Sequence, residues 1–378
     1  MQKGADALIY LDHAATTPLK REAFEAMLPY FCEQYANASG SYGAARKSRH
    51  AIDLARKEVA SAIGAKPAEI YFTSGGTESD NWAICGAVRA NENKKHIITS
   101  KIEHHAVLRV CRELEKQGYL VTWLDVDQYG RVRVQDVLNA MREDTVLVSV
   151  MLANNEIGTI EPVSEISAIA HEYGAIMHTD AVQAAGHIPI DVETLGVDML
   201  SMSAHKFGGP KGIGALYVRS GVRIERLFFG GEQERSLRSG TENTPAIVGM
   251  GKAIEISCSQ MSEMAERIAF LRDSMQSQLQ KISSIHVNGD FSHRLPGHLH
   301  ITVDGYDTQV LLMKLDMAGV AASAGSACAS GSLARSHVIK ALGIAKENQA
   351  DIRFTIGENN SLEDITKTVD VMRRILIK

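Results

Sequence analysis

The sequence predicts an α/β fold, with a mostly parallel central sheet in a large domain and a smaller α+β domain at the C-terminal end. Two observations carry this prediction. Short apolar runs alternate with helical patterns over the first two thirds of the 378 residues. From about Ile254 the pattern changes to one long amphipathic stretch followed by separated strands and helices. Strand–helix alternation on this scale is typical of a parallel sheet covered by helices.

The strands of the large domain are expected where short apolar and β-branched runs meet polar or glycine-rich segments. These runs are Ile70–Thr73, His96–Ser100, Thr145–Val150, Ala175–Thr179, Met199–Ser203 and Gly214–Val218. Helical periodicity between the runs predicts the covering helices. They are expected at Glu78–Val88, Ala106–Lys116 and Val163–His171.

The smaller domain begins with the amphipathic helical pattern of Ser262–Ile282. Three strands are expected after it, at His300–Val303, Val320–Ser323 and Ile352–Ile356. Its other helices are expected at Gln309–Met317, Leu333–Leu342 and Leu362–Ile377. We therefore expect a large domain at residues 13–255, and a small domain made of residues 1–12 and 256–378.

Composition excludes several classes of protein. The formal net charge is −5 and no long basic run occurs, which argues against nucleic acid as a partner. No stretch of about 18 apolar residues is present, so no membrane span is expected, and the first ten residues do not resemble a signal peptide. The cysteines are odd in number and form no C-x-x-C pair, which argues against a disulfide framework or structural zinc and fits a reducing cytoplasm.

Cys328 lies in a run of small residues, Ser323–Ser332, that contains Gly325 and Gly331. Large apolar neighbours that would bury the thiol are missing from this run, and glycine permits backbone freedom. Loops of this kind often carry functional groups. The alternative is a strand-to-helix turn that happens to contain a cysteine.

Lys206 follows the expected strand Met199–Ser203 in the sequence Ser203-Ala204-His205-Lys206, which leads into a glycine-rich turn. A lysine at the end of a core strand is partly desolvated, and desolvation lowers the pKa of its amine. A neutral amine is what Schiff-base chemistry requires. Ser203 and His205 are polar groups that could hold a phosphate. The alternative is a surface lysine at a strand end.

Four other segments also follow expected strands. Thr73–Ser79 is rich in glycine and hydroxyl groups and leads into a helix, as in phosphate cradles. Asp180 ends the strand Ala175–Thr179, where it could pair with a pyridinium nitrogen or cap a helix. His104 could stack on a planar cofactor or carry a proton. Asn155 could donate to a substrate or cofactor oxygen, or simply form a turn.

A metal site at His104 and His105 is not expected, because adjacent residues do not converge easily on one ion. The combined pattern is a phosphate cradle, a ring stacker, a partner for a ring nitrogen and a Schiff-base amine. These groups in one α/β domain point to pyridoxal 5′-phosphate.

With these motifs the sequence resembles the cysteine desulfurases of the NifS/IscS class, in the class V aminotransferase family of fold-type I (aspartate aminotransferase-like) pyridoxal phosphate enzymes. The resemblance covers essentially the whole chain. It rests on Ile9–Pro18, Thr73–Asn81, Glu103-His104, Ala153–Gly158, His178–Gln183, Ser203–Lys206, Arg238–Thr241, Gly325–Cys328 and Ile352–Phe354.

The resemblance implies a role for each matched residue. Lys206 would form the Schiff base, Asp180 would pair with the ring nitrogen, and His104 would stack on the ring. Gln183 would reach the phenolic oxygen, and Asn155 and Arg353 would engage the substrate carboxylate. The phosphate would be held by Gly76, Thr77, Ser203 and His205, with Thr241 from the other subunit of a homodimer.

The implied reaction converts L-cysteine to L-alanine and leaves the sulfur on Cys328 as a persulfide, with His104 handling thiol protons. The sulfur would pass to an iron–sulfur scaffold or a thiolation protein. The family commonly has Asn-Pro-Ser-Ser-x-His where this chain has Tyr35–Tyr42, and a longer tail for scaffold docking, so the acceptor stays open. Alternatives are a related enzyme for selenocysteine or cysteine sulfinate, and a sulfur-relay subunit with weak catalysis.

Overall fold

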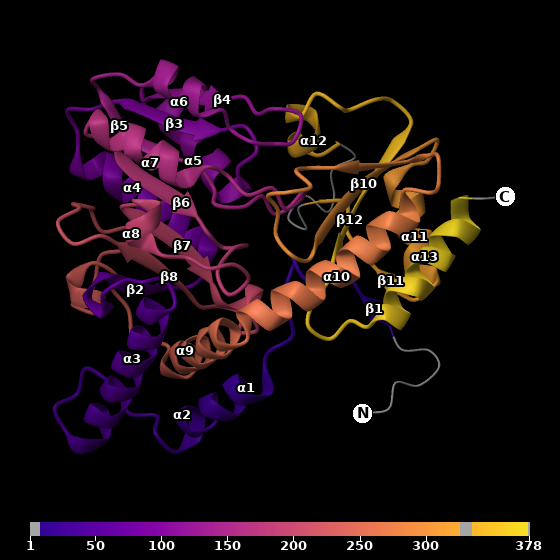
Figure 1. Cartoon of the computed structure of the whole chain (residues 1–378). Helices are drawn as coiled ribbons and strands as arrows, with labels where there is room; N and C mark the ends of the chain where they lie inside the picture. Colours follow the sequence, from indigo (N-terminus) through magenta and orange to yellow (C-terminus); the bar gives the residue numbers. More distant parts are fainter. Residues whose placement is uncertain (1–7, 326–334, 377–378) are drawn as a thin grey trace.

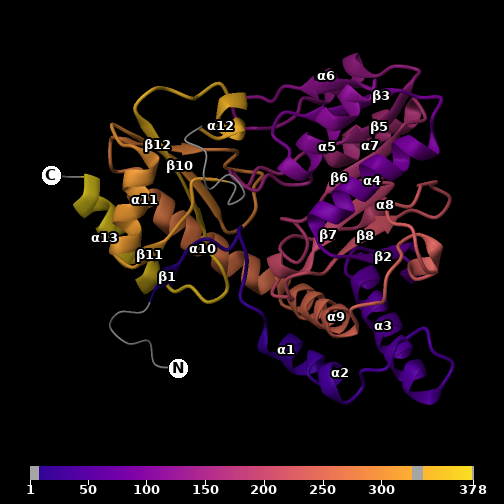
Figure 2. The same cartoon turned by 180° about the vertical axis from the view of Figure 1, so that it is seen from behind.

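The computed structural model describes residues 8–325 and 335–376. Cys328 lies outside the described residues. Figures 1 and 2 show two units side by side, a large one built on a broad sheet and a smaller one that carries the C-terminal helix. The element order begins β1, α1, α2, α3, so helices precede the first strand of the large sheet.

The large unit is built on a seven-stranded sheet in the order β2-β8-β7-β6-β5-β3-β4. Strands β3 to β7 run parallel, whereas β8 is antiparallel to both β2 and β7. The predicted α/β fold with a mostly parallel sheet is therefore confirmed. The strands are β2 (Ile70–Thr73), β3 (His96–Ser100), β4 (Leu120–Leu124), β5 (Thr145–Ser149), β6 (Ile176–Asp180), β7 (Met199–Ser203) and β8 (Gly214–Val218).

Both faces of this sheet are covered, because successive residues of its strands point into different cores. Leu147 of β5 packs in a cluster with Trp82 of α4, whereas Val148 packs in a second cluster with Ile166 of α7. The helices of this unit are α1 (Arg21–Met27), α2 (Pro29–Cys32), α3 (Gly43–Ser61), α4 (Gly76–Ala90), α5 (His105–Lys116), α6 (Val134–Ala140), α7 (Val163–Glu172), α8 (Val192–Leu195) and α9 (Thr244–Ser259).

Strand β4 was not predicted. It lies at the edge of the sheet, and Leu120 at its start is half exposed. An edge strand has a partner on one side only and needs no continuous apolar run, so its sequence signal is weak.

The smaller unit holds an antiparallel sheet in the order β12-β10-β9, beside the short parallel pair β1-β11. Its strands are β1 (Ile9–Tyr10), β9 (Ile285–Asn288), β10 (His298–Asp304), β11 (Val320–Ala321) and β12 (Gln349–Thr355). Its helices are α10 (Met261–Leu279), α11 (Thr308–Met317) and α13 (Leu362–Leu376), whereas Val338 and Ile339 of α12 (His337–Ala341) pack in the core of the large unit.

Helix α12 is shorter than the predicted helix Leu333–Leu342. The described helix begins at His337 because Ser336 has extended backbone and its hydroxyl accepts a hydrogen bond from the Val338 amide at 3.0 Å. Residues 333 and 334 lie outside the described part of the chain.

The two long helices α9 and α10 meet at Gln260. Helix α9 packs on α1 and α3 of the large unit, whereas α10 packs on α13 and β10 of the small one. We propose Gln260 as the boundary, five residues beyond the expected end of the large domain at residue 255. In the described part of the chain, none of the helices has the length and apolar composition that a bilayer crossing requires.

A buried ion pair holds a strained turn against the large sheet. Glu234, Arg235 and Ser236 have positive φ angles of 46°, 57° and 65°, which non-glycine residues rarely adopt. The Glu234 carboxylate accepts two hydrogen bonds from Arg56, both at 2.7 Å, and one from the Phe72 amide at 2.9 Å. These charge-assisted contacts offset the strain of the turn.

We predict that Glu234→Gln lowers the free energy of unfolding by about 3–5 kcal/mol, because it leaves the buried Arg56 guanidinium without its countercharge. Urea unfolding of the cofactor-free protein measures the change. The matched control is Glu25→Gln, which removes the exposed Arg21–Glu25 pair and is expected to have no measurable effect. Equal losses in the two variants would contradict a special role for the buried pair.

Candidate active site

One cavity lies where the strands β3, β5, β6 and β7 end. It has about 770 Å³ of empty volume, including its open mouth. Most of the residues predicted to act in the site line this cavity together. They are Gly76, Thr77, His104, Asn155, Asp180, Gln183, Ser203, His205, Lys206 and Arg353.

The first turn of α4 forms one end of the cavity. Gly75 has a φ of 150°, and a side chain at Gly76 would place its Cβ only 2.6 Å from Val182 Cγ2. Glycine therefore leaves the start of the helix open, where the helix dipole favours an anion. Ser203 and His205 border the same space, and His205 Nδ1 lies 3.1 Å from the Thr16 hydroxyl.

Lys206 follows β7 in a short 3-10 helix, and its amine is held by two main-chain carbonyls. Its Nζ donates to Ala14 O at 2.5 Å and to Ala15 O at 3.0 Å. Gln183 Nε2 also donates to Ala14 O, at 3.0 Å. The Ala14 carbonyl thus positions both side chains. Sequence reasoning missed this contact, because a main-chain acceptor leaves no signature in side-chain composition.

Asp180 ends β6 and is only 6% exposed. Its Oδ1 accepts a hydrogen bond from the Val182 amide at 2.9 Å, while its carboxyl lines the cavity. The alternative that Asp180 caps a helix is wrong, because β6 is followed by a turn and, in the described chain, no helix begins there before α8; Asp180 caps that turn and borders the cavity. Burial raises the pKa of Asp180 to about 6, against the opposing effects of the Val182 amide and Lys206.

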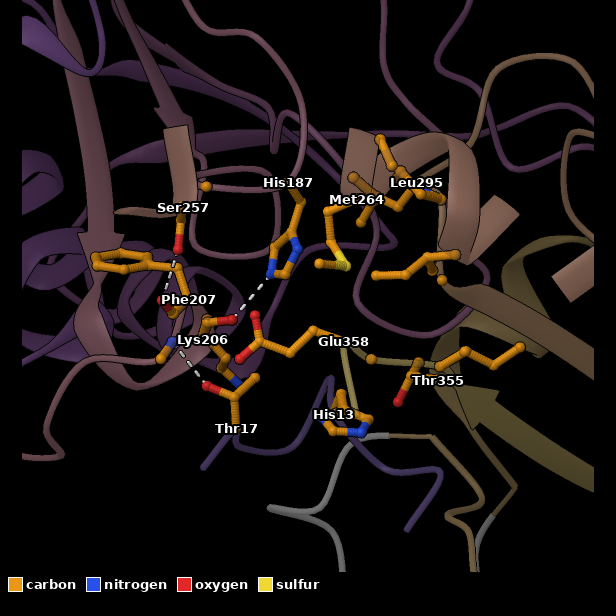
Figure 3. A pocket seen from close by; sticks show the side chains of 18 of the residues that line it. His13, Thr17, His187, Lys206, Phe207, Ser257, Met264, Leu295, Thr355 and Glu358 are labelled. Carbon is orange, nitrogen blue, oxygen red and sulfur yellow. Dashed lines mark hydrogen bonds between the residues drawn. The ribbon is translucent and has the colours of Figure 1, made fainter. Parts of the chain in front are cut away.

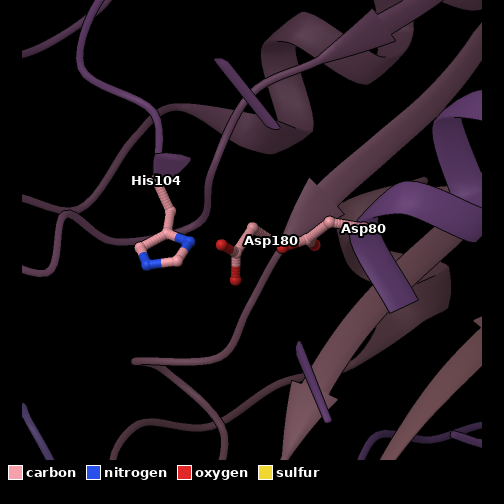
Figure 4. A group of neighbouring side chains, drawn as sticks. All are labelled: Asp80, His104 and Asp180. Carbon is pink, nitrogen blue, oxygen red and sulfur yellow. The ribbon is translucent and has the colours of Figure 1, made fainter. Parts of the chain in front are cut away.

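Asp80 is a cavity residue that sequence reasoning missed. It lies one turn into α4, on the same face as Gly76, and helical spacing of four residues was the available signal. Side-chain ligand atoms of Asp80, His104 and Asp180 lie within 4.8 Å of one another (Figure 4). Such spacing would also suit a metal ion, and the expected absence of a metal here stays a prediction.

His104 is the N-cap of α5. Its Nδ1 accepts a hydrogen bond from the Ala106 amide at 3.2 Å, so the neutral ring carries its proton on Nε2. Burial lowers the pKa of His104 to about 4, with smaller contributions from Lys206 and His105. The imidazole is therefore neutral at pH 7, and its stacking on a ring stays a prediction.

Arg353 reaches the cavity from β12 of the small unit. Its Nη2 donates to Asp12 Oδ1 at 2.7 Å and its Nη1 donates to the Asn155 main-chain carbonyl at 2.8 Å. Its Nε is buried without a partner among the described residues. The Arg353 guanidinium, which is predicted to bind the substrate carboxylate, is thus oriented by two protein acceptors.

One predicted residue in the described part of the chain is not brought into the cavity. Thr241 is exposed and does not line it. Cys328 lies outside the described residues.

A second cavity of about 830 Å³ adjoins the other side of the Lys206 segment (Figure 3). His187 Nε2 donates there to the Lys206 main-chain carbonyl at 2.9 Å, and Met264 and Leu295 supply part of an apolar wall. The phosphate cradle, Asp180 and His104 all border the first cavity instead. We therefore assign the candidate active site to the first cavity.

Comparison with known proteins agrees with this geometry. The family model described as "Aminotransferase class-V" matches residues 9–367. A protein of Methanosarcina thermophila described as "Cysteine desulfurase IscS" is 50% identical over 372 residues, which cover 98% of this chain and 92% of that protein.

Solved structures are similar over nearly the whole chain. A structure described as "NIFS-LIKE PROTEIN" has 36% identity and a TM-score of 0.92, and the match covers 98% of this chain and 99% of that chain. Another, described as "SspA in complex with cysteine", has 36% identity and a TM-score of 0.83, with 93% and 100% covered.

We predict that His104→Ala lowers the free energy of unfolding by about 1 kcal/mol at pH 7, because it removes the N-cap of α5. His104→Asn should keep this stability, since an asparagine oxygen can accept from the Ala106 amide. Chemical unfolding of both cofactor-free variants measures the difference. A stable His104→Ala variant would show that the cap contributes nothing.

The pH dependence of the free energy of unfolding provides a second prediction for His104. The folded-state pKa of His104 lies below its usual value of about 6.5, so wild-type stability falls as the pH drops from about 6.5 to 4. His104→Asn should flatten this fall. An unchanged slope would contradict the buried, neutral imidazole.

Proposed function

The chain belongs to the aminotransferase class-V family and is an enzyme of the cysteine desulfurase type that depends on pyridoxal 5′-phosphate. On that premise we propose how the cavity residues release sulfur from L-cysteine. The observation that carries the proposal is the meeting of Lys206, Asp180, His104 and the open start of α4 in one cavity.

The described residues fit the cofactor. Gly76 at the start of α4 leaves room for a phosphate, because an added Cβ there would lie 2.6 Å from Val182 Cγ2. A buried carboxyl, Asp180, borders the same cavity and suits a protonated ring nitrogen. The Lys206 amine borders the same cavity and donates to the Ala14 and Ala15 main-chain carbonyls. In this proposal Gly76, Thr77, Ser203 and His205 hold the phosphate, and Gln183 faces the phenolic oxygen.

When bound, the cofactor supplies an electron sink that makes the substrate Cα–H acidic and weakens the Cβ–S bond. Lys206 carries the Cα proton, since its flexible amine borders the cavity. Arg353 and Asn155 orient the substrate carboxylate, because Arg353 enters already held by Asp12. His104 stays neutral and presents its Nε2–H to the cavity, where it can donate to the ring or to a sulfur atom.

Cys328 accepts the sulfur in the proposed reaction. Its thiolate forms an S–S bond to the substrate sulfur while the substrate Cβ–S bond breaks, and the electron pair of that bond stays on carbon, where it takes up a proton. The products are a persulfide on Cys328 and L-alanine. A protein acceptor, either an iron–sulfur scaffold or a thiolation protein, would then take the sulfur.

We further propose a homodimer in which Thr241 reaches the cofactor phosphate of the partner subunit. Thr241 is exposed and is not part of the cavity lining of its own chain, which supports this arrangement. A reducing compartment such as the cytoplasm is proposed as well, because Cys32, Cys85, Cys111 and Cys258 are free thiols. Neither nucleic acid nor membrane is a partner in this proposal.

We predict that Lys206→Ala prevents covalent attachment of the cofactor and lowers turnover by about 10²–10⁴-fold, because it removes the group that transfers the Cα proton. Borohydride reduction followed by peptide mass spectrometry should label the Lys206 peptide in the wild type alone. Lys252→Ala, on the exposed face of α9, is the matched control and should keep both label and turnover. A cofactor label at another lysine would contradict the assignment of Lys206 as the lysine that binds the cofactor covalently.

We predict that Cys328→Ala keeps the visible absorption of the bound cofactor but lowers alanine and sulfide production from L-cysteine by more than about a hundredfold, as expected for a lost nucleophile. Alanine and sulfide are measured with a thiol reductant present. Cys258→Ala should retain full activity. Undiminished turnover on L-cysteine would disprove the persulfide step, and turnover kept on selenocysteine alone would favour the related substrate.

A further inference from the structure

Asp80 is a buried carboxyl that the proposed mechanism does not use. It lies on α4, lines the active-site cavity and is only 1% exposed. Figure 4 shows its carboxyl beside that of Asp180, and the ligand atoms of the two residues lie within 4.8 Å. Its Oδ1 has no hydrogen-bond partner among the described residues.

The groups around Asp80 offer it no positive charge. His178 Nε2 lies 3.7 Å from Asp80 Oδ1, but burial lowers the pKa of His178 to about 3, so this contact is not an ion pair. Both His178 nitrogens already hydrogen-bond to hydroxyl groups, at Ser149 (2.9 Å) and Ser201 (3.0 Å). The Ser201 hydroxyl hydrogen-bonds to the Asp80 carboxyl and lowers its pKa, but burial and Asp180 raise this pKa more.

The other titratable groups near the two aspartates favour negative charge on Asp180 and disfavour it on Asp80. Glu103 is buried, its pKa is raised to about 8 chiefly by burial, and it disfavours charge on Asp80 further. His104 is neutral. Lys206 acts instead on Asp180, which also receives the Val182 amide at 2.9 Å.

Two carboxyls that share a buried site cannot both be ionised at little cost. The negative charge belongs on the carboxyl with the better donors, which is Asp180. The proton belongs on Asp80, where an ionised oxygen would be left without a donor. The strong rise in the pKa of Asp80, caused by burial and then by Asp180, agrees with this assignment.

We propose that Asp80 is a positioning residue, a neutral carboxylic acid whose O–H group supports the ionised Asp180 as partner of the cofactor ring nitrogen. The inference rests on the proposed function, because the ring nitrogen is the group that needs Asp180 as an anion. Asp80 acts through Asp180 and contributes no step of its own to the reaction.

Asparagine and valine at position 80 both remove the carboxyl group, but only asparagine keeps a hydrogen-bond donor. Asp80→Asn keeps an N–H donor and should bind pyridoxal phosphate within about threefold of the wild type. Asp80→Val is apolar, branches at Cβ instead of Cγ and has no donor, and it should bind at least about tenfold more weakly at pH 7, the range expected for a lost hydrogen bond to a charged group. Fluorescence titration of the cofactor-free proteins measures both affinities.

The pH dependence identifies the cause of the loss. Without its donor, Asp180 takes up a proton more readily, so the defect of Asp80→Val should shrink as the pH rises from 7 to 9. If Asp80 is instead ionised in the wild type, both substitutions relieve repulsion on Asp180, and neither weakens binding. That result, or an equal defect in Asp80→Asn and Asp80→Val, would overturn the proposal.

Unfolding of the cofactor-free proteins tests the proton on Asp80 independently. If native Asp80 keeps its proton while the unfolded chain ionises near pH 4, wild-type stability falls with rising pH and Asp80→Asn escapes that loss. The melting temperature of Asp80→Asn relative to the wild type should therefore increase steadily from pH 4 to 7. A difference that stays constant above pH 5 would show that Asp80 is ionised.

Glu161→Gln is the matched control. Glu161 is a second buried carboxyl, with its pKa raised to about 8 mainly by burial, and it does not line the cavity. Its substitution should reproduce the pH-dependent gain in melting temperature and leave cofactor affinity unchanged. Failure of the wild type to bind pyridoxal phosphate would refute the proposed function, whereas the unfolding experiment would still decide the state of Asp80.

Discussion

Several parallel strands of the large sheet end side by side, and the chemistry of this protein depends on the polar residues at those strand ends. The strands β3, β5, β6 and β7 are buried on both faces, so their polar residues are found where the strands stop. His104, Asn155, Asp180 and Lys206 each follow or end one of these strands. They lie around one cavity because neighbouring parallel strands end side by side.

The small unit completes the cavity through the chain segment that follows β1. Asp12 pairs with Arg353 of β12, and the Ala14 amide donates to the Thr355 hydroxyl at 2.9 Å. The carbonyl of the same Ala14 holds Lys206 and Gln183. A short N-terminal segment therefore couples the position of the small unit to the position of the reactive amine.

Burial also sets the charge state of the site. Asp80, Glu103 and Asp180 lie in surroundings that disfavour negative charge, and His104 and His178 lie in surroundings that disfavour positive charge. Buried groups without suitable partners therefore stay neutral, and few groups in the cavity carry a charge. Among the described cavity residues, Lys206, Asp180 and Arg353 each have hydrogen-bond partners that suit their charge.

Much of this was predictable from the sequence. Apolar runs and helical periodicity located the strands β2, β3, β5, β6, β7 and β8, and the polar residues after them identified Lys206, Asp180, His104 and Asn155 as candidates. The edge strand β4 escaped prediction because its apolar pattern is weak, and the N-terminal helices were missed although α3 is amphipathic. Asp80 was missed although it lies four residues after Gly76 on the same face of α4, because a carboxylate inside a helix is more often exposed than buried.

The sequence by itself determined which chemical groups are available and at which strand ends they lie, since that information is local. The tertiary structure alone decided which of them share an environment. The Ala14 carbonyl reaches Lys206 across 192 positions of the chain, and Arg353 reaches the Asn155 carbonyl across 198. Hydrogen bonds between residues so distant, and the pKa values that burial imposes on Asp80 and Asp180, arise only when the packed units exclude water from a common space.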